Sequence, residues 1–179
     1  NLNRSQILLD TVILPQLSNE IQRLQWQVEC KDKWPTLSLE LSNTKIKLFP
    51  YQKEGVERAL RAGRFIIADE MGLGKTVQGI VWAEALLRSK TVKKVLVVCP
   101  NALKFQWQRE WFKTSGRSVQ IVEGSTEDRQ QIYRTQAGVF VVNYELLLRD
   151  LPAIIALMPE AVILDEAQRI KNYMTKTSQ

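Results

Sequence analysis

Histidine is absent from this chain of 179 residues, and cysteine occurs only twice, at Cys30 and Cys99. Zinc and haem sites draw on these residue types, and neither cysteine lies in a paired motif, so we exclude a His- or Cys-based metal site in this segment. The chain also lacks an apolar run of the roughly 20 residues that span a bilayer. Its early stretch ILLDTVILPQL is interrupted by Asp10 and Pro15. We therefore expect a soluble, intracellular protein without a secretory signal, in the cytoplasm of a bacterium or the nucleus of a eukaryote.

Positive charge is in excess but is spread along the sequence. The chain has 25 Lys and Arg against 19 Asp and Glu, a formal net charge of +6. Such a balance favours a polyanionic partner when the charges gather on one face. The basic residues fall mainly in two regions, 45–64 and 88–94, and form no continuous run. The charge is therefore compatible with nucleic acid without establishing it.

Short apolar runs alternate with helical patterns from residue 65 onward. The runs lie at 65–68, 95–99, 119–122, 139–143 and 161–165. Their nearly continuous apolar character is typical of strands buried on both faces of a parallel sheet. Helical patterns occupy 75–88, 102–113, 127–134 and 144–157, the last interrupted by Pro152. This alternation predicts a doubly wound α/β fold with a mostly parallel central sheet and helices on both faces.

Residues 1–44 have a different pattern. Their apolar spacing indicates one or two amphipathic helices with a break near Pro15, followed by a possible strand at 36–41, where leucines alternate with polar residues. We interpret 1–44 as an accessory segment or the end of a preceding domain, and 45–179 as a separate lobe of a longer protein.

Two tryptophans share one face of the helix expected at 102–113. Trp107 and Trp111 follow Leu103 at intervals of four residues, which places all three on the same side of the helix. Stacking on nucleic-acid bases is conceivable, but packing against the sheet is the favoured interpretation.

The stretch FIIADEMGLGKTVQ, at 65–78, joins a strand pattern to a glycine-rich turn and a Lys-Thr pair that opens a helix. This is the arrangement of a P-loop, in which backbone N–H groups and a helix N-terminus surround phosphate oxygens. The predicted ligand is a nucleoside triphosphate, ATP, with Mg²⁺. Lys75 would reach the β and γ phosphates, and the Thr76 hydroxyl would bind Mg²⁺. The predicted nucleotide-binding residues of this loop are Asp69, Glu70, Met71, Gly72, Leu73, Gly74, Lys75 and Thr76.

One position of this loop departs from the usual pattern. Asp69 stands where the P-loop template has its first glycine. Aspartate tolerates unusual backbone angles better than most residues, so we expect the loop to be retained.

The stretch AVILDEAQ, at 161–168, places an acidic pair at the end of an expected strand. A triphosphate bound with Mg²⁺ needs a carboxylate near the metal and a group that orients or deprotonates water. Asp165 would hold Mg²⁺, directly or through water, and Glu166 is the candidate general base. Such a pair is by itself often a surface turn or a helix N-cap. The P-loop earlier in the chain favours the catalytic interpretation, with Lys75, Asp165 and Glu166 as catalytic residues.

Five segments in order carry a resemblance to a known family. They are LFPYQKEGV (48–56), ADEMGLGKTVQ (68–78), VVCPNALKFQWQREW (97–111), VVNYELL (141–147) and DEAQRIKN (165–172). Together they resemble the first RecA-like lobe of the SWI/SNF-type DNA translocases, within the superfamily-two helicase-type ATPases. The resemblance implies ATP hydrolysis, double-stranded DNA as the partner, and a second RecA-like lobe in the full-length chain.

The resemblance also implies roles for individual residues. Gln52 would contact the adenine edge of the nucleotide. Asn101 and Lys104 would face the DNA backbone together with Asn143, and Tyr144 would lie on the same side or serve as a packing residue. Gln168 stands where many members have histidine, at a position that couples the nucleotide to the DNA side; glutamine can still donate and accept hydrogen bonds there.

Three functional hypotheses remain open at this point. The leading one is an ATP-dependent motor on double-stranded DNA, and the alternative enzyme is a strand-separating helicase of the DEAD/DEAH kind acting on RNA or DNA. A nucleotide-binding scaffold without turnover is the alternative of another class, which the intact Lys75, Thr76, Asp165 and Glu166 argue against. An arginine finger from a second lobe is worth on the order of 10³ to 10⁵ in rate. We therefore expect this segment alone to hydrolyse ATP very slowly.

Overall fold

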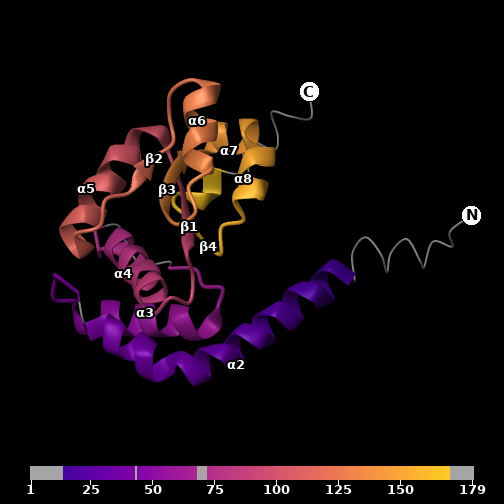
Figure 1. The fold of residues 1–179 in the computed structure, drawn as a ribbon. Helices are drawn as coiled ribbons and strands as arrows, with labels where there is room; N and C mark the ends of the chain where they lie inside the picture. The colour runs from indigo at the N-terminus through magenta and orange to yellow at the C-terminus, as the bar shows by residue number, and fades with distance from the viewer. Residues whose placement is uncertain (1–13, 43, 68–71, 170–179) are drawn as a thin grey trace, which may run out of the picture.

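The computed structural model describes residues 14–42, 44–67 and 72–169. Its elements follow the chain in this order (Figure 1): α2 (Leu14–Ser42), α3 (Pro50–Ala62), α4 (Lys75–Arg88), β1 (Lys94–Cys99), the short 3₁₀ helix η2 (Asn101–Leu103), α5 (Lys104–Ser115), β2 (Gln120–Ile121), α6 (Thr126–Tyr133), β3 (Gly138–Asn143), α7 (Tyr144–Arg149), α8 (Leu151–Leu157), β4 (Ala161–Leu164) and the 3₁₀ helix η3 (Ala167–Arg169).

The described strands form one parallel sheet in the order β2-β3-β1-β4. Val97 of β1 is in register with Val141 of β3 on one side and with Ile163 of β4 on the other. Because the strands are parallel, their carboxyl ends meet at one edge of the sheet, which is where ligands bind in open α/β folds. This edge carries the residues that follow Cys99, those at Asn143, and those that follow Leu164.

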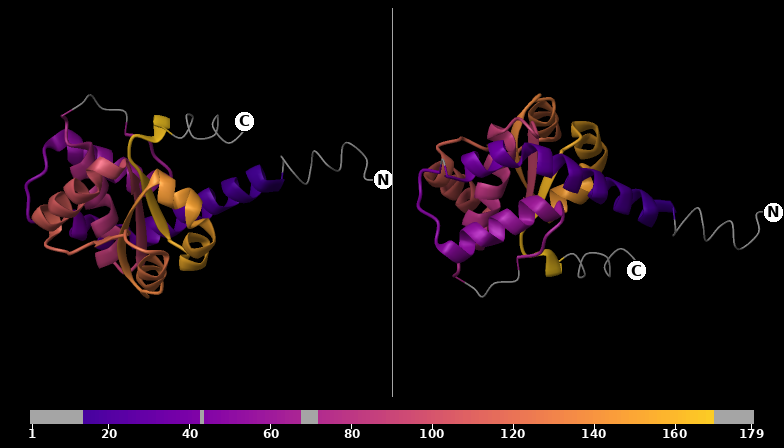
Figure 2. Two further views of the ribbon diagram at one scale, coloured as in Figure 1. Left: turned by 90° about the horizontal axis from the view of Figure 1, so that it is seen from above. Right: turned by 90° about the horizontal axis from the view of Figure 1, so that it is seen from below.

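Helices cover both faces of the sheet, as the sequence predicted (Figure 2). Alternate residues of a strand point to opposite faces. Val95 and Val97 therefore enter the core formed with α2, α3, α4 and α5, whereas Leu96 and Val98 enter the core formed with α6, α7 and α8. The two apolar layers explain why the strands read as continuous hydrophobic runs.

Helix α2 lies with its carboxyl-terminal half against α3 and α4, and its amino-terminal half extends away from the body (Figures 1 and 2). The Trp26 indole N–H donates to the Leu60 carbonyl at 2.8 Å, and the Arg61 guanidinium lies 3.6 Å from the centre of the Trp34 ring. These contacts join residues from the expected accessory segment to α3. The division of the chain at residue 44 stays a prediction.

The strand predicted at 36–41 is wrong, because these residues belong to α2. Leu37 and Leu41 are four residues apart, so they lie on one helix face, and both are buried. Leu39 lies between them on another face and is 68% exposed. Alternation over so few residues fits a helix as well as a strand, and burial against α3 and α4 decided between them.

The strand predicted at 65–68 is not formed over its described part, 65–67. Within the described residues this segment pairs with no strand, although β4, which pairs only with β1, has an open edge. Ile66 is 86% exposed. The other four strands are confirmed, although β2 is shorter than predicted. The predicted interruption at Pro152 is also confirmed, because Pro152 lies in the first turn of α8, where no backbone N–H is needed.

No helix in the described part of the chain is both long and apolar enough to cross a membrane.

Candidate functional site

The glycine-rich turn leads directly into α4. Gly74 is the N-cap of this helix of 14 residues, with φ at 76°, and Gly72 has φ at 88°. Both angles lie in the left-handed region that favours glycine. A Cβ built on Gly74 would stand only 2.4 Å from the amide nitrogen of Gln52. The turn therefore depends on glycine at Gly74, and it opens a helix N-terminus, the kind of position at which proteins commonly bind anions.

Helix α3 holds this turn from the side. The amide nitrogen of Gln52 and the hydroxyl of Tyr51 both donate to the carbonyl of Leu73, each at 3.2 Å. The other amide atom of Gln52 accepts from the backbone N–H of Phe49 at 3.0 Å. Gln52 is buried and lies against the glycine-rich turn, while its predicted contact with adenine stays a prediction.

Lys75 and Thr76 open α4, and both are partly buried. Their position at the helix start fits the demand for a cation and a hydroxyl beside phosphate oxygens and Mg²⁺. The predicted contacts of Asp69, Glu70 and Met71 fall outside the described residues.

Asp165 follows β4 directly and is held at three points. Its backbone N–H donates to the Val98 carbonyl at 2.8 Å. Its carboxylate oxygen Oδ2 accepts from the Trp107 indole N–H at 2.9 Å, and its backbone carbonyl accepts from the Tyr144 hydroxyl at 2.7 Å. The residue is only partly buried, so its carboxylate is accessible to a ligand.

Helix α4 and Asp165 both contact Trp107. A Cβ built on Gly79 of α4 would stand 3.6 Å from Trp107 Cη2 and 3.7 Å from Ile163 Cδ1. Gly79 follows Lys75 by about one helical turn. The second turn of α4, the indole of Trp107 and Ile163 of β4 are therefore neighbours on one side of the sheet, while a Mg·ATP site shared by Lys75 and Asp165 stays a prediction.

Glu166 has an uncommon backbone conformation for a residue other than glycine, with φ at 55°. Such strain costs about 1–3 kcal/mol and clusters at functional sites. The Glu166 side chain is exposed, and its carboxylate accepts a hydrogen bond from the amide of Gln168. The structure thus brings the predicted general base and the predicted coupling residue into contact with each other.

The three residues predicted to face DNA differ in how they are presented. Asn143 caps α7 by accepting from the backbone N–H of Leu146 at 2.8 Å, and its amide nitrogen donates to Asn101 at 2.9 Å. Asn101 is exposed, whereas Asn143 is buried. Lys104 is also buried, with its ammonium 3.3 Å from the Glu123 carboxylate. Of the three, Asn101 is the one whose side chain faces solvent.

Two neighbours of the site were missed as functional residues by sequence reasoning. Trp107 was predicted to pack in the core, and it does, but its indole also binds Asp165. Tyr51 carried no signal beyond its place beside Gln52.

Cys99, at the end of β1, is buried. This burial, with the Asp165 charge as a smaller cause, raises the pKa of its thiol to about 12. A thiol with such a pKa is inert as a nucleophile.

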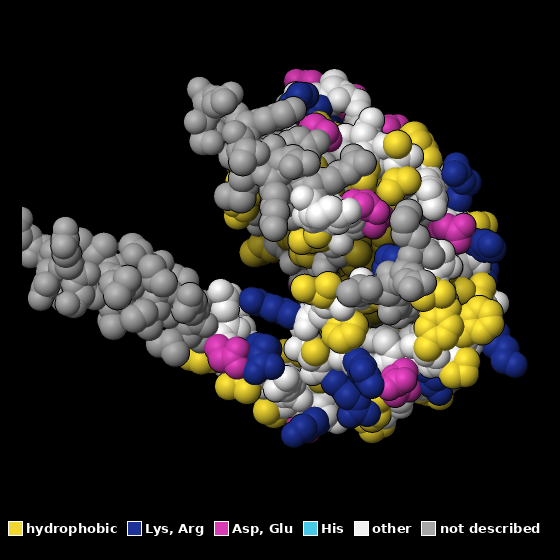
Figure 3. Space-filling model, turned by 180° about the vertical axis from the view of Figure 1, so that it is seen from behind, with side chains coloured by type: hydrophobic (Ala, Val, Ile, Leu, Met, Phe, Trp, Pro, Cys, Tyr) yellow, Lys and Arg dark blue, Asp and Glu magenta, His cyan; other side chains and the backbone are white. Residues whose placement is uncertain are grey.

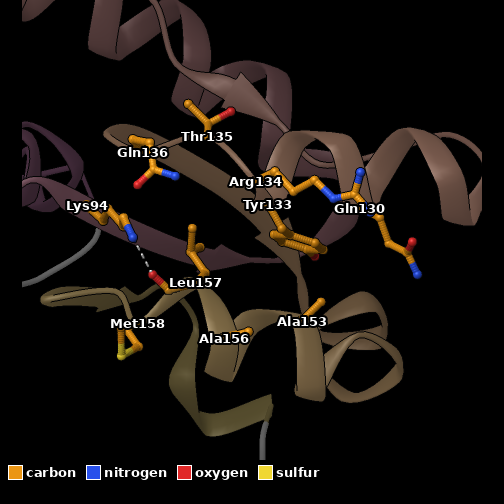
Figure 4. A pocket seen from close by; sticks show the side chains of 10 residues that line it. All are labelled: Lys94, Gln130, Tyr133, Arg134, Thr135, Gln136, Ala153, Ala156, Leu157 and Met158. Carbon is orange, nitrogen blue, oxygen red and sulfur yellow. Dashed lines mark hydrogen bonds between the residues drawn. The ribbon is translucent and has the colours of Figure 1, made fainter.

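A pocket of about 500 Å³ lies elsewhere, between α6 and α8 (Figure 4). It adjoins Lys94, the first residue of β1, whose ammonium donates to the Leu157 carbonyl at 2.9 Å. Because Lys94 begins β1 and Asp165 follows β4, the pocket lies at the amino edge of the parallel sheet, away from the candidate site.

Seen from behind the view of Figure 1, the surface shows Lys and Arg side chains interspersed with acidic and apolar ones (Figure 3). This agrees with the dispersed positive charge of the sequence.

Comparison with known proteins identifies the family. The SNF2-related domain matches residues 20–179. The DNA excision repair protein ERCC-6-like of Bos taurus is 35% identical over 147 residues, which is 74% of this chain and 12% of that protein. The DNA repair and recombination protein RAD54B of Gallus gallus is 35% identical over 149 residues, or 73% of this chain and 16% of that protein. The chain therefore spans less than a fifth of either relative.

A solved structure agrees with these matches. The Sulfolobus solfataricus SWI2/SNF2 ATPase core in complex with dsDNA superposes with a TM-score of 0.62 at 33% identity, covering 75% of this chain and 29% of that one. The α/β fold of this chain is thus the RecA-like fold of such ATPase cores, and the predicted resemblance is confirmed. The chain belongs to the SNF2-related family of helicase-like ATPases.

Proposed function

We propose that this chain is the ATP-binding lobe of an ATP-dependent translocase on double-stranded DNA, which hydrolyses ATP when a second RecA-like lobe of the full-length protein closes on it. The observation that carries the proposal is that Trp107, whose indole N–H donates to Asp165, also lies beside Gly79, about one helical turn after Lys75. The solved relative with dsDNA supports the choice of duplex DNA as the partner.

Each residue has a distinct part in this proposal. The backbone N–H groups at Gly74 and the Lys75 ammonium would bind phosphate oxygens, and the left-handed glycines make room for that approach. Thr76 and Asp165 would hold Mg²⁺, which supplies charge neutralisation at the phosphates when bound. Glu166 would orient or deprotonate the attacking water, and its exposed carboxylate leaves it accessible to the interface between two lobes.

The test is the nucleic-acid dependence of ATP hydrolysis in the full-length protein. Under the proposal, duplex DNA stimulates hydrolysis more than single strands or RNA do, and the protein displaces a triplex-forming strand without separating the duplex. Stimulation by RNA alone, or unwinding of a duplex, would favour the DEAD/DEAH-type helicase. Glu166→Gln should abolish turnover while ATP still binds, and unchanged turnover would point to a scaffold instead.

A further inference from the structure

From the contacts of Asp165 we infer that Trp107 and Tyr144 are positioning residues for the metal-binding turn. Trp107 would fix the orientation of the Asp165 carboxylate, and Tyr144 would fix the peptide between Asp165 and Glu166. This inference rests on the proposed function, because it assumes that Asp165 binds Mg²⁺ and that Glu166 acts on water. It assigns to α5 and to the start of α7 a task beyond packing.

The geometry of Trp107 suits this task. Its indole is almost fully buried, and a buried N–H needs an acceptor, which the Asp165 carboxylate supplies at 2.9 Å. The bond engages Oδ2 and leaves Oδ1 for Mg²⁺ or a water bound to it. The ring is itself fixed, because it lies beside Gly79 of α4 and its centre is 6.3 Å from the centre of the Trp111 ring. A carboxylate held by a rigid donor loses little freedom when it binds a metal, and donors of this kind support affinity.

Tyr144 acts on the backbone of the same turn. Its ring is buried, and its hydroxyl donates at 2.7 Å to the carbonyl of Asp165. That carbonyl belongs to the peptide that enters Glu166, whose φ of 55° is strained. A hydrogen bond at this peptide stabilises the strained turn and so sets the direction from which Glu166 leaves the sheet.

The same two segments carry the residues predicted to face DNA. Asn101 precedes Trp107 at the start of the α5 region, and Asn143 directly precedes Tyr144. These two asparagines are joined by a hydrogen bond of 2.9 Å. The two segments that position the Asp165–Glu166 turn are therefore also joined to each other beside the residues predicted to face DNA.

The experiment compares three variants of the full-length protein. Trp107→Phe keeps an aromatic ring and removes the indole N–H, and Tyr144→Phe removes only the hydroxyl. Trp111→Phe is the matched control, because it makes the same change on the same helix but removes a hydrogen bond to Glu84 rather than one to Asp165. The measurements are Mn²⁺ binding in the presence of ADP, followed by electron paramagnetic resonance, and the Mg²⁺ dependence, kcat and KM of ATP hydrolysis.

Trp107→Phe should weaken Mn²⁺ binding and raise the half-saturating Mg²⁺ concentration by about 10- to 100-fold. Tyr144→Phe should lower kcat more than it changes KM for ATP, because it acts on the placement of Glu166. Trp111→Phe should leave metal binding unchanged even if it lowers stability. Equal metal binding in Trp107→Phe and the wild type would overturn the assignment of Trp107. A wild-type kcat in Tyr144→Phe would overturn the assignment of Tyr144.

Asp165→Asn separates this inference from the proposed function. If Asp165→Asn loses Mn²⁺ binding and Trp107→Phe keeps it at the wild-type level, only the positioning role of Trp107 is refuted. Unchanged Mn²⁺ binding in Asp165→Asn would refute the proposed metal site itself.

Discussion

Glu84 is a buried charge outside the candidate site. It lies on α4 with 3% of its surface exposed and accepts from the Trp111 indole at 2.7 Å. Arg117 donates to it at 2.7 Å and Arg88 at 3.2 Å. The carboxylate thereby ties the helix that begins at the glycine-rich turn to α5 and to the segment after it. We predict that Glu84→Ala destabilises the lobe strongly.

The magnitude follows from what each partner loses. The Trp111 N–H is fully buried and would be left without an acceptor, at a cost of about 1–3 kcal/mol. Arg88 and Arg117 are 23% and 38% exposed at their side chains, so they turn to solvent and each loses about 1 kcal/mol or less. The free energy of unfolding should fall by about 1–5 kcal/mol in total.

Urea unfolding followed by tryptophan fluorescence measures this loss. The control is Glu54→Ala, which makes the same change at an exposed i,i+4 pair with Arg58 and should cost about 0.5 kcal/mol or less. If the two variants lose the same stability, the Glu84 carboxylate does not hold α4 to α5 and the reasoning from burial fails.

The Glu84 contribution also has a defined pH dependence. Burial raises the pKa of Glu84, but hydrogen bonds from Arg117 and Trp111, with the charges of Arg117 and Arg88, outweigh it and hold the pKa below 4.5. A folded pKa below the unfolded one stabilises the protein above pH 4.5, and this stability is lost as the pH falls through the folded pKa. The difference between the wild type and Glu84→Ala should therefore be constant near neutrality and shrink in acid.

Three further predictions concern single contacts. Gly74→Ala should weaken ATP binding, measured by calorimetry on the full-length protein, because the added methyl would collide with Gln52 and strain a left-handed residue; unchanged affinity would contradict the described turn. Leu37→Ala should lower the free energy of unfolding by about 2–5 kcal/mol, whereas Leu39→Ala should change it by less than about 0.5 kcal/mol; equal losses in urea unfolding would contradict the helical assignment of 36–41. Asn143→Ala should cost about 1 kcal/mol through the lost cap of α7, detected as a lower urea midpoint, and no loss would show that the cap is unimportant.

Much of the fold could be predicted because a strand buried on both faces has a nearly continuous run of apolar residues in the sequence. The runs that became β1, β3 and β4 are nearly continuous in apolar residues, and each is confirmed within a residue or two. The run at 65–68 has the same composition, yet its described part forms no strand. A strand exists only when a neighbour accepts its hydrogen bonds, and composition cannot report whether that neighbour is in place.

The chemistry of the candidate site was likewise predictable in part. The types and order of Gly74, Lys75 and Asp165 predict a site for phosphate and Mg²⁺, and this assignment stays a prediction. The burial of Lys104 and its pairing with Glu123 were not predictable, because both depend on how α5 packs beside the end of β2. The same holds for Asn143, whose amide serves a helix cap and a neighbouring asparagine.

The sequence by itself determined the parallel α/β architecture, the glycine-rich helix start and the acidic pair, because local patterns of apolar and polar residues set strands, turns and helix ends. Only the tertiary structure decided that Leu37 and Leu41 belong to a helix and that Trp107 and Tyr144 donate to Asp165. The physical reason is that a hydrogen bond between residues far apart in sequence is set by the packing of whole elements. No local pattern encodes where α5 and α7 place their donors relative to β4.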